Sequence, residues 1–175
     1  LYFLKRDPKL IERRLRAGPI AEKEPSQKII QALAMLFFIL VIVVPGIDHR
    51  FRWSDVPAPL VIVGDFFVGQ GFLIYFLVCR ENSFASATLE VGQDQKVVSS
   101  GPYRVVCHPL YAGGLLMFLF IPLGMGSYWG LLFVPPMIVV IIWRLLSEER
   151  FLIENLPGYD EYRKNTRYRL VPLVW

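Results

Sequence analysis

The stretch that decides the fold lies at residues 101–111, which have the sequence GPYRVVCHPLY. It places polar, aromatic and turn-forming residues directly before a long apolar segment. Pro109 disfavours a helical backbone at His108 and suits the first turn of a helix that begins there. We therefore expect a ring nitrogen of His108 at the mouth of a membrane helix. An isolated His-Pro pair also fits a plain polar connector, so its meaning depends on the rest of the chain.

Three apolar blocks dominate the chain, at residues 29–44, 58–79 and 111–143. With 54% hydrophobic residues in a length of 175, the chain is more apolar than a soluble domain of its size. Each of the first two blocks is about long enough to cross a hydrocarbon core of roughly 30 Å, and the third is too long for one crossing. The third block is therefore predicted to be a helical hairpin. Its natural turn is Gly124-Met125-Gly126-Ser127, which leaves apolar segments at residues 111–123 and 128–146.

The sequence thus predicts an all-α polytopic membrane protein with about four transmembrane helices and a C-terminal helical hairpin. The chain opens on Leu1 and not on methionine, so we expect that the native start is missing. An additional, fifth span could then precede the first block.

The basic residues are distributed unevenly between the loops. Of the 19 Lys and Arg residues, eight lie before residue 29, three lie in the 80–110 loop and six lie from residue 144 onward. The 45–57 loop holds the other two. Because Lys and Arg collect on the cytoplasmic side of membrane proteins, both ends of the chain are expected there. The net charge of +4 is then a topology signal that also favours anionic lipid headgroups, and we expect no nucleic-acid surface.

Proline and glycine predict local features of the spans. Pro45-Gly46 is expected to end the first helix, and Pro135-Pro136 is expected to kink the returning helix at mid-membrane. In the second span, Asp65 and Gln70 indicate a polar interior. The competing prediction, which is compatible with it, is close packing against a neighbouring helix at Gly64, Gly69 and Gly71. The two cysteines are not spaced as a metal site, and near the reducing side of the membrane they need no disulfide.

The N-terminal arm, residues 1–28, mixes charges of both signs. Leu10, Ile11 and Leu15 lie at near-helical spacing and predict an interfacial helix up to Gly18-Pro19. A solvated arm without such a helix is the open alternative.

A second polar cluster, residues 144–150 (RLLSEER), stands at the exit of the hairpin. Arg144 and Glu148 are four residues apart, which puts them on one helical face. A hairpin returns the chain to the side where it began, so both are expected to emerge near His108 and Tyr111. Without substrate, Glu148 is the expected partner of Arg144. Snorkelling charges with a local ion pair are the alternative interpretation.

Taken in order, these residues resemble the integral membrane methyltransferases typified by isoprenylcysteine carboxyl methyltransferase, with the phospholipid N-methyltransferases as relatives. The resemblance extends from about residue 82 to residue 172 and is specific as an ordered set around a hairpin. One departure is Cys107, where the family usually has arginine. The matching segments are VVSSGPY at 97–103, HPLY at 108–111 with Gly113, the cluster at 144–149 and GYDEY at 158–162.

By its length the chain is expected to be one domain over residues 1–175, with an arm (1–28), two spans (29–79) and a third part (80–175). The resemblance implies that this domain is a membrane methyltransferase and that residues 80–175 are its cofactor-binding and catalytic half. It implies that S-adenosylmethionine is held in a cytoplasmic pocket, in a prokaryotic inner membrane, without a metal. By motif position, Arg144 would bind the acceptor, and Arg144 and Glu148 would be the catalytic residues. The cofactor-binding residues would be Gln95, Lys96, Val97, Val98, Tyr103, His108, Pro109, Leu110, Tyr111 and Glu148.

The chemistry of the reaction bears on the acceptor. Methyl transfer from a sulfonium is an in-line displacement, so the enzyme mainly aligns the reactants, removes water and holds charge. A carboxylate acceptor is already deprotonated at neutral pH, and Arg144 could orient it through two hydrogen bonds. An amine acceptor must lose a proton, for which His108 or a glutamate would have to serve.

We therefore expect a lipophilic acceptor that enters from the lipid bilayer, with a carboxylate as the first choice. Three alternatives stay open: a phospholipid or amine N-methyltransferase, a nicotinamide-dependent membrane reductase, and a non-enzymatic membrane protein that keeps the fold. Cys107 is the best support for the last of these. The sequence leaves the oligomeric state open.

Overall fold

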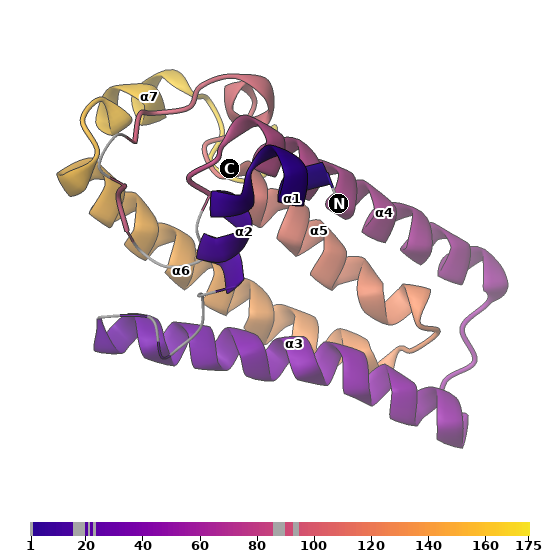
Figure 1. Ribbon diagram of the computed structural model, residues 1–175. Coiled ribbons are helices and arrows are strands. Elements are labelled where there is room, and N and C mark those ends of the chain that lie inside the picture. Colours follow the sequence, from indigo (N-terminus) through magenta and orange to yellow (C-terminus); the bar gives the residue numbers. More distant parts are fainter. Residues whose placement is uncertain (1, 16–19, 21, 23, 86–89, 93–94) are drawn as a thin grey trace.

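A computed structural model of the chain describes residues 2–15, 20, 22, 24–85, 90–92 and 95–175. These residues form helices joined by turns and loops, without a β-strand among them (Figure 1). In chain order the elements are α1 (Tyr2–Arg6), α2 (Pro8–Leu15), α3 (Pro25–Phe51), α4 (Ala58–Glu81), the 3-10 turn η1 (Gly101–Arg104), α5 (Pro109–Gly124), the 3-10 turn η2 (Trp129–Phe133), α6 (Val134–Asn155) and α7 (Tyr159–Asn165).

The long helices have the length and composition of membrane spans. In the described part of the chain, three helical segments are long and apolar enough to cross a bilayer: α3, α4 and the run Trp129–Asn155 that joins η2 to α6. The shorter α5, of 16 residues, is apolar as well. Large apolar side chains such as Ile62 and Phe66 are exposed on the outside of the bundle, where lipid would cover them. The predicted all-α membrane fold is confirmed.

Glycines bring α4 and α5 into close contact. A Cβ atom on Gly71 would lie 2.3 Å from Cγ of Met117, and one on Gly64 would lie 2.4 Å from the backbone nitrogen of Gly124. Gly69 has open space around its Cα, so the prediction is wrong for this residue. Gly64 and Gly71 are seven residues apart and share a helical face, whereas Gly69 points elsewhere.

Pro45 does not end the first span, contrary to the prediction, because α3 continues through it to Phe51. Asp48 explains why the last turns stay helical, since its fully buried carboxylate accepts hydrogen bonds from Ser54 and Ser127. Ser54 gives both its backbone N–H, at 2.7 Å, and its hydroxyl, at 2.6 Å. The end of α3 is thereby tied to the turn between α5 and η2. In such a setting a proline within a membrane helix is tolerated.

Pro135 and Pro136 lie in the first turn of α6, directly after η2, so the predicted mid-helix kink is wrong. A proline disrupts a helix interior because it lacks an N–H and its ring clashes with the preceding turn. Neither cost applies in a first turn, where the N–H would have no partner within the helix.

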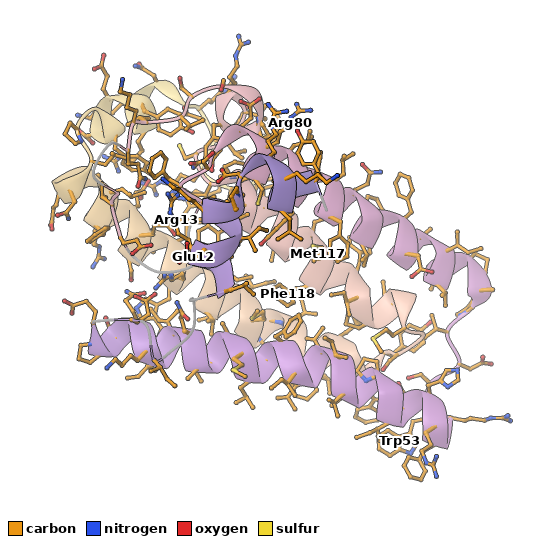
Figure 2. All side chains as sticks on the ribbon, in the orientation of Figure 1. Glu12, Arg13, Trp53, Arg80, Met117 and Phe118 are labelled. Carbon is orange, nitrogen blue, oxygen red and sulfur yellow. The ribbon has the colours of Figure 1, made fainter. Side chains whose placement is uncertain are left out.

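The bundle has two distinct ends. α4 packs along α5, α5 runs beside α6, and α6 runs beside α3, while α2 and α7 lie at the same end as the C-terminus (Figure 1). Arg13 and Arg80 lie at this end, and Trp53 lies at the other (Figure 2). The loop before α5, the tail after α6 and the arm are thus brought together, as the hairpin predicts.

Candidate functional site

A pocket lies at the end of the bundle that carries α2 and α7. It has about 760 Å³ of space, including its open mouth. Its walls come from the loop after α4, from η1 and the first turn of α5, from the last turns of α6 and from α7. The structure places in this lining every residue that was expected to hold a cofactor: Gln95, Lys96, Val97, Val98, Tyr103, His108, Pro109, Leu110, Tyr111 and Glu148.

Tyr103 stands on η1, which starts at Gly101 with a φ of +56°, a conformation that favours glycine. Asn82, at the end of α4, donates a hydrogen bond of 2.9 Å from its side-chain amide to the Tyr103 hydroxyl. Burial raises the pKa of Tyr103 to about 12. At neutral pH the pocket wall therefore holds a neutral phenol at this point.

His108 is the residue directly before α5, with Pro109 in the first helical position, as the His-Pro pair predicts. Its backbone N–H donates to the carbonyl of Arg169 at 2.9 Å, and its Nε2 lies 3.2 Å from the Tyr159 hydroxyl. Burial, with a smaller contribution from the nearby Arg169, lowers the pKa of His108 to about 4. The imidazole is neutral at pH 7 and adds no positive charge to the pocket.

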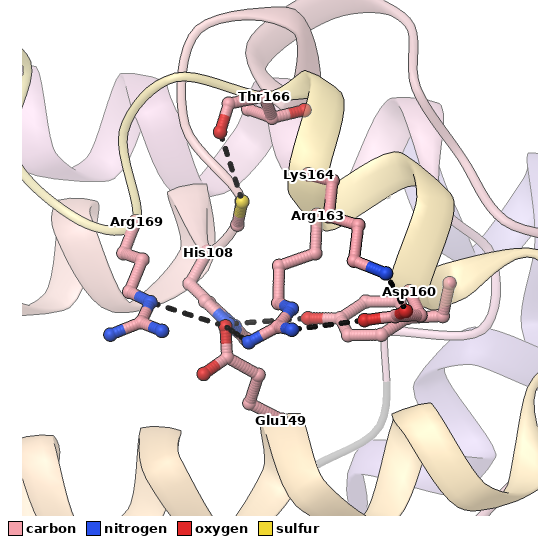
Figure 3. A network of polar contacts seen from close by, with 9 residues as sticks. His108, Glu149, Asp160, Arg163, Lys164, Thr166 and Arg169 are labelled. Carbon is pink, nitrogen blue, oxygen red and sulfur yellow. Dashed lines mark hydrogen bonds and ion pairs between the residues drawn. The ribbon is translucent and has the colours of Figure 1, made fainter.

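The C-terminal tail is fixed over the loop before α5. Val106 and Tyr168 form a parallel bridge, and the Tyr162 hydroxyl donates to the carbonyl of Tyr103 at 2.9 Å. Glu149, which is buried, points to the tail and not to the pocket: its Oε1 lies 3.4 Å from Nε of Arg169 (Figure 3). The two adjacent glutamates of α6 thus serve different sides, with Glu148 at the pocket and Glu149 at the tail.

Cys107 occupies a buried position beneath the same tail. Its thiol lies 3.9 Å from the carbonyl oxygen of Thr166, and burial raises its pKa. The thiol therefore stays protonated at neutral pH, which makes it a weak nucleophile. Both Cys79 and Cys107 are free, as expected.

Tyr111 and Glu148 meet across the hairpin, although 37 residues separate them. The Tyr111 hydroxyl, on α5, donates a hydrogen bond to Oε2 of Glu148, on α6. Both side chains line the pocket. The expected convergence of the two polar clusters is present, and it places one carboxylate in the pocket wall.

Arg144 forms its ion pair with the arm, not with Glu148 as predicted. Its guanidinium lies 2.7 Å from Oε1 of Glu22 and donates a hydrogen bond to the side-chain oxygen of Gln27. Arg144 is one helical turn deeper than Glu148, and Glu148 already accepts from Tyr111. Arg144 is 8% exposed and is absent from the described pocket lining, but it lies close enough to Tyr111 and Glu148 to interact with both electrostatically.

The arm packs on the protein through α2, as a helix with a buried anchor. Leu10 is 1% exposed and contacts Cys79 and Ala85. Arg13 donates from its guanidinium to the carbonyl of Ser83 at 2.5 Å. The predicted helix is present, while its expected end at Gly18-Pro19 lies outside the described residues.

Several residues of this end of the bundle were not singled out from the sequence. No motif or periodicity in the sequence marks Glu22 or Gln27 as a partner of Arg144. The sequence indicates only that a buried guanidinium needs a polar or charged partner. Apolar and aromatic parts of the pocket wall from α6 and its end also escaped notice, namely Phe151, Leu152 and Leu156.

The arrangement suits a ligand that carries positive charge beside a flat apolar group. The lining holds two carboxylates, Glu90 and Glu148, against one ammonium, Lys96. His108 and Tyr103 are neutral, and apolar surface comes from residues such as Val97. A family model described as phospholipid methyltransferase matches residues 60–157, which include most of the pocket wall. A comparison with curated proteins finds no match for the chain. On the family match, which spans more than half of its length, the chain belongs to the phospholipid methyltransferase family.

Proposed function

We propose that the protein transfers a methyl group from S-adenosylmethionine to a lipophilic acceptor that reaches the pocket from the bilayer. One observation carries this proposal: a single pocket gathers the cofactor residues expected by motif position from three separate segments, at 95–98, 103–111 and 148. The packing of α4, α5 and α6 and the contacts of the C-terminal tail bring these segments together. The family match supports a methyltransferase over a nicotinamide-dependent reductase.

The residues present fit this methyl donor. S-adenosylmethionine supplies a methyl group on a positively charged sulfonium, next to an ammonium group, a ribose and an adenine ring. Glu148 would hold the ammonium or the ribose hydroxyls, and the ring of Tyr111 would face positive charge. His108, being neutral, does not repel a cation. Val97 and Val98 provide an apolar wall for the adenine.

For the acceptor we propose a carboxylate oriented by Arg144. A guanidinium matches a carboxylate with two parallel hydrogen bonds, and a carboxylate needs no general base at neutral pH. Arg144 lies close to the pocket wall, because it interacts electrostatically with Tyr111 and Glu148, which line the pocket. Glu22 would have to give up its place on the guanidinium.

A second candidate function is N-methylation of a phospholipid amine. It is favoured because the pocket lining contains the carboxylate of Glu148, whereas the guanidinium that would bind a carboxylate acceptor, Arg144, is already paired with Glu22. An amine acceptor must lose a proton, and Glu148, which accepts a hydrogen bond from Tyr111, is a carboxylate of the pocket wall that would take it.

Purified protein in detergent provides the test. S-adenosylmethionine and reduced nicotinamide cofactors are titrated calorimetrically, and S-adenosylmethionine alone is expected to bind. Transfer of a labelled methyl group is then compared between a prenylated cysteine analogue and vesicles of phosphatidylethanolamine. Label in the first supports the carboxylate acceptor, and label in the second supports the amine. A protein that does not bind S-adenosylmethionine would contradict the proposal.

We also propose that the pocket faces the cytoplasm, on the basis of the basic residues around it. α7, which carries Lys164, and the segment after α3, which carries Asp55, lie at opposite ends of the bundle (Figure 1). Both residues are exposed, so each is replaced in turn by cysteine. Impermeant thiol reagents should label the first from the cytoplasm and the second from the other side. The two native cysteines are buried, which keeps the background low.

A further inference from the structure

We propose that Glu22 determines acceptor specificity: its carboxylate occupies Arg144 until the carboxylate of an acceptor displaces it. The inference deepens the proposed function and rests on it, since it concerns the acceptor end of the same site. It concerns a residue of the arm, far from the pocket in sequence, that touches the guanidinium directly.

The contact has the geometry of a bound carboxylate. Oε1 of Glu22 lies 2.7 Å from the guanidinium of Arg144 and accepts a hydrogen bond of 2.6 Å from the side-chain amide of Gln31. A second amide, that of Gln27, accepts from Arg144 through its oxygen. The side chains of Arg144 and Glu22 are only 9% and 2% exposed. A buried guanidinium, held by Gln27, and the side-chain amide of Gln31 thus form a site for one carboxylate, and a residue of the chain itself fills it.

The same guanidinium adjoins the pocket. Arg144 interacts electrostatically with Tyr111 and Glu148, and the last two line the pocket. A carboxylate held on Arg144 would therefore lie at the edge of the space in which we place the methyl donor. The arm also contacts the other side of the pocket, because the guanidinium of Arg13 lies 4.8 Å from the centre of the Phe84 ring, and Phe84 is in the lining.

Charge favours exchange over simple addition. Glu22 and Glu148 are two carboxylates around one guanidinium. A third carboxylate from the acceptor would add repulsion in a buried site, whereas replacing Glu22 keeps the charge balance unchanged. A neutral acceptor that displaced Glu22 would instead leave Arg144 with less counter-charge. A neutral acceptor is thus expected to leave the pair intact and to gain nothing from Arg144, whereas a carboxylate is expected to exchange with Glu22.

The test is direct binding of a prenylated cysteine analogue with a free carboxylate, measured calorimetrically without S-adenosylmethionine. Glu22→Gln removes the competing charge and should bind the analogue about tenfold to a hundredfold more tightly than the unaltered protein, as expected for one hydrogen-bonded charge. The carboxamide of the same analogue should bind both proteins equally. The matched control is Glu24→Gln, because Glu24 is exposed and caps the start of α3 through its backbone carbonyl, not through its side chain.

Equal affinity of Glu22→Gln and the unaltered protein for the carboxylate overturns the inference, as does tighter binding of the carboxamide as well. Absence of binding to all variants also overturns it, because Arg144 is then not an acceptor site. If Glu22→Gln does not fold, Glu22→Asp, which keeps the charge but withdraws it by one methylene group, should show a smaller gain, and no gain overturns the inference. A protein that binds the analogue with this pattern but not S-adenosylmethionine would contradict the proposed methyl donor alone.

Discussion

Glu148→Gln tests the centre of the proposed site with a nearly isosteric change. The substitution replaces the carboxylate in the pocket wall with a neutral amide. The amide oxygen can still accept from the Tyr111 hydroxyl, so the contact between α5 and α6 is kept. The variant therefore changes the charge offered to the ligand more than it changes the packing of the hairpin.

The expected loss is in affinity for S-adenosylmethionine. A hydrogen bond to a charged group contributes about 1.5–3 kcal/mol, which corresponds to about a tenfold to a hundredfold rise in Kd. S-adenosylhomocysteine separates the possible contacts, because it keeps the ammonium and ribose but lacks the sulfonium charge. Equal losses for both ligands would place Glu148 at the ammonium or ribose, and a loss for S-adenosylmethionine alone would place it at the sulfonium.

Calorimetric titration in detergent measures both Kd values, and the apparent Tm without ligand reports folding. Glu154→Gln is the matched control, since Glu154 is exposed on the same helix, outside the described pocket lining. It should leave the affinity unchanged. The reasoning is refuted if Glu148→Gln binds S-adenosylmethionine within about twofold of the unaltered protein while its apparent Tm is also unchanged.

Three further predictions concern other parts of the site and fold. Arg144→Lys keeps the charge but loses the paired geometry, so methyl transfer to a carboxylate should fall at least about tenfold while the Kd for S-adenosylmethionine stays nearly constant; a parallel collapse of both would assign Arg144 to the cofactor pocket or to the fold. The pKa of about 4 for His108 lies below the ordinary 6.5, so the unfolded chain takes up a proton first as the pH falls. Stability should then drop by up to about 1.4 kcal/mol per pH unit from pH 6.5 to pH 4, and His108→Gln should flatten this slope of apparent Tm against pH. Gly71→Ala adds a Cβ atom 2.3 Å from Cγ of Met117 and should cost about 1–3 kcal/mol in thermal unfolding, whereas Gly46→Ala, with open space around it, should cost nothing.

The membrane fold was predictable because hydrophobic length and turn residues act locally. The hairpin turn falls at Gly124, where α5 ends, as the glycine and serine there indicate. The two errors at proline have one physical cause: a proline disrupts a helix only where it removes a hydrogen bond that nothing replaces. Asp48 stabilises the last turns of α3 beyond Pro45, and Pro135 stands in a first turn. The pattern of apolar residues predicts neither the hydrogen bonds of Asp48 nor the residue at which α6 begins.

The candidate site was predictable to the extent that the hairpin dictates it. Returning α6 to the side of His108 brings Glu148 to the same end of the bundle as Tyr111, where the two side chains are hydrogen-bonded. The partner of Arg144 was not predictable in this way. Spacing of four residues favours Glu148, but spacing on one helix says nothing about a carboxylate that arrives from another segment. Glu22 arrives with the arm, and no periodicity connects residue 22 with residue 144.

The position of Glu22 in the chain bears on how acceptor choice is encoded. The family match covers residues 60–157 and so includes α5, α6 and the Glu148–Tyr111 contact, while Glu22, Gln27 and Gln31 lie before it. If the donor pocket is built by the matched part and the acceptor site by the arm and α3, the two can vary independently. We then expect that exchanging the arm and the start of α3 alters which headgroup is accepted without altering the affinity for S-adenosylmethionine. The physical reason is that Arg144 contacts Glu22 of the arm and also interacts with Glu148 of the pocket wall. In the proposed exchange, an acceptor reaches Arg144 only by replacing the arm's side chain, so that side chain affects which acceptor binds.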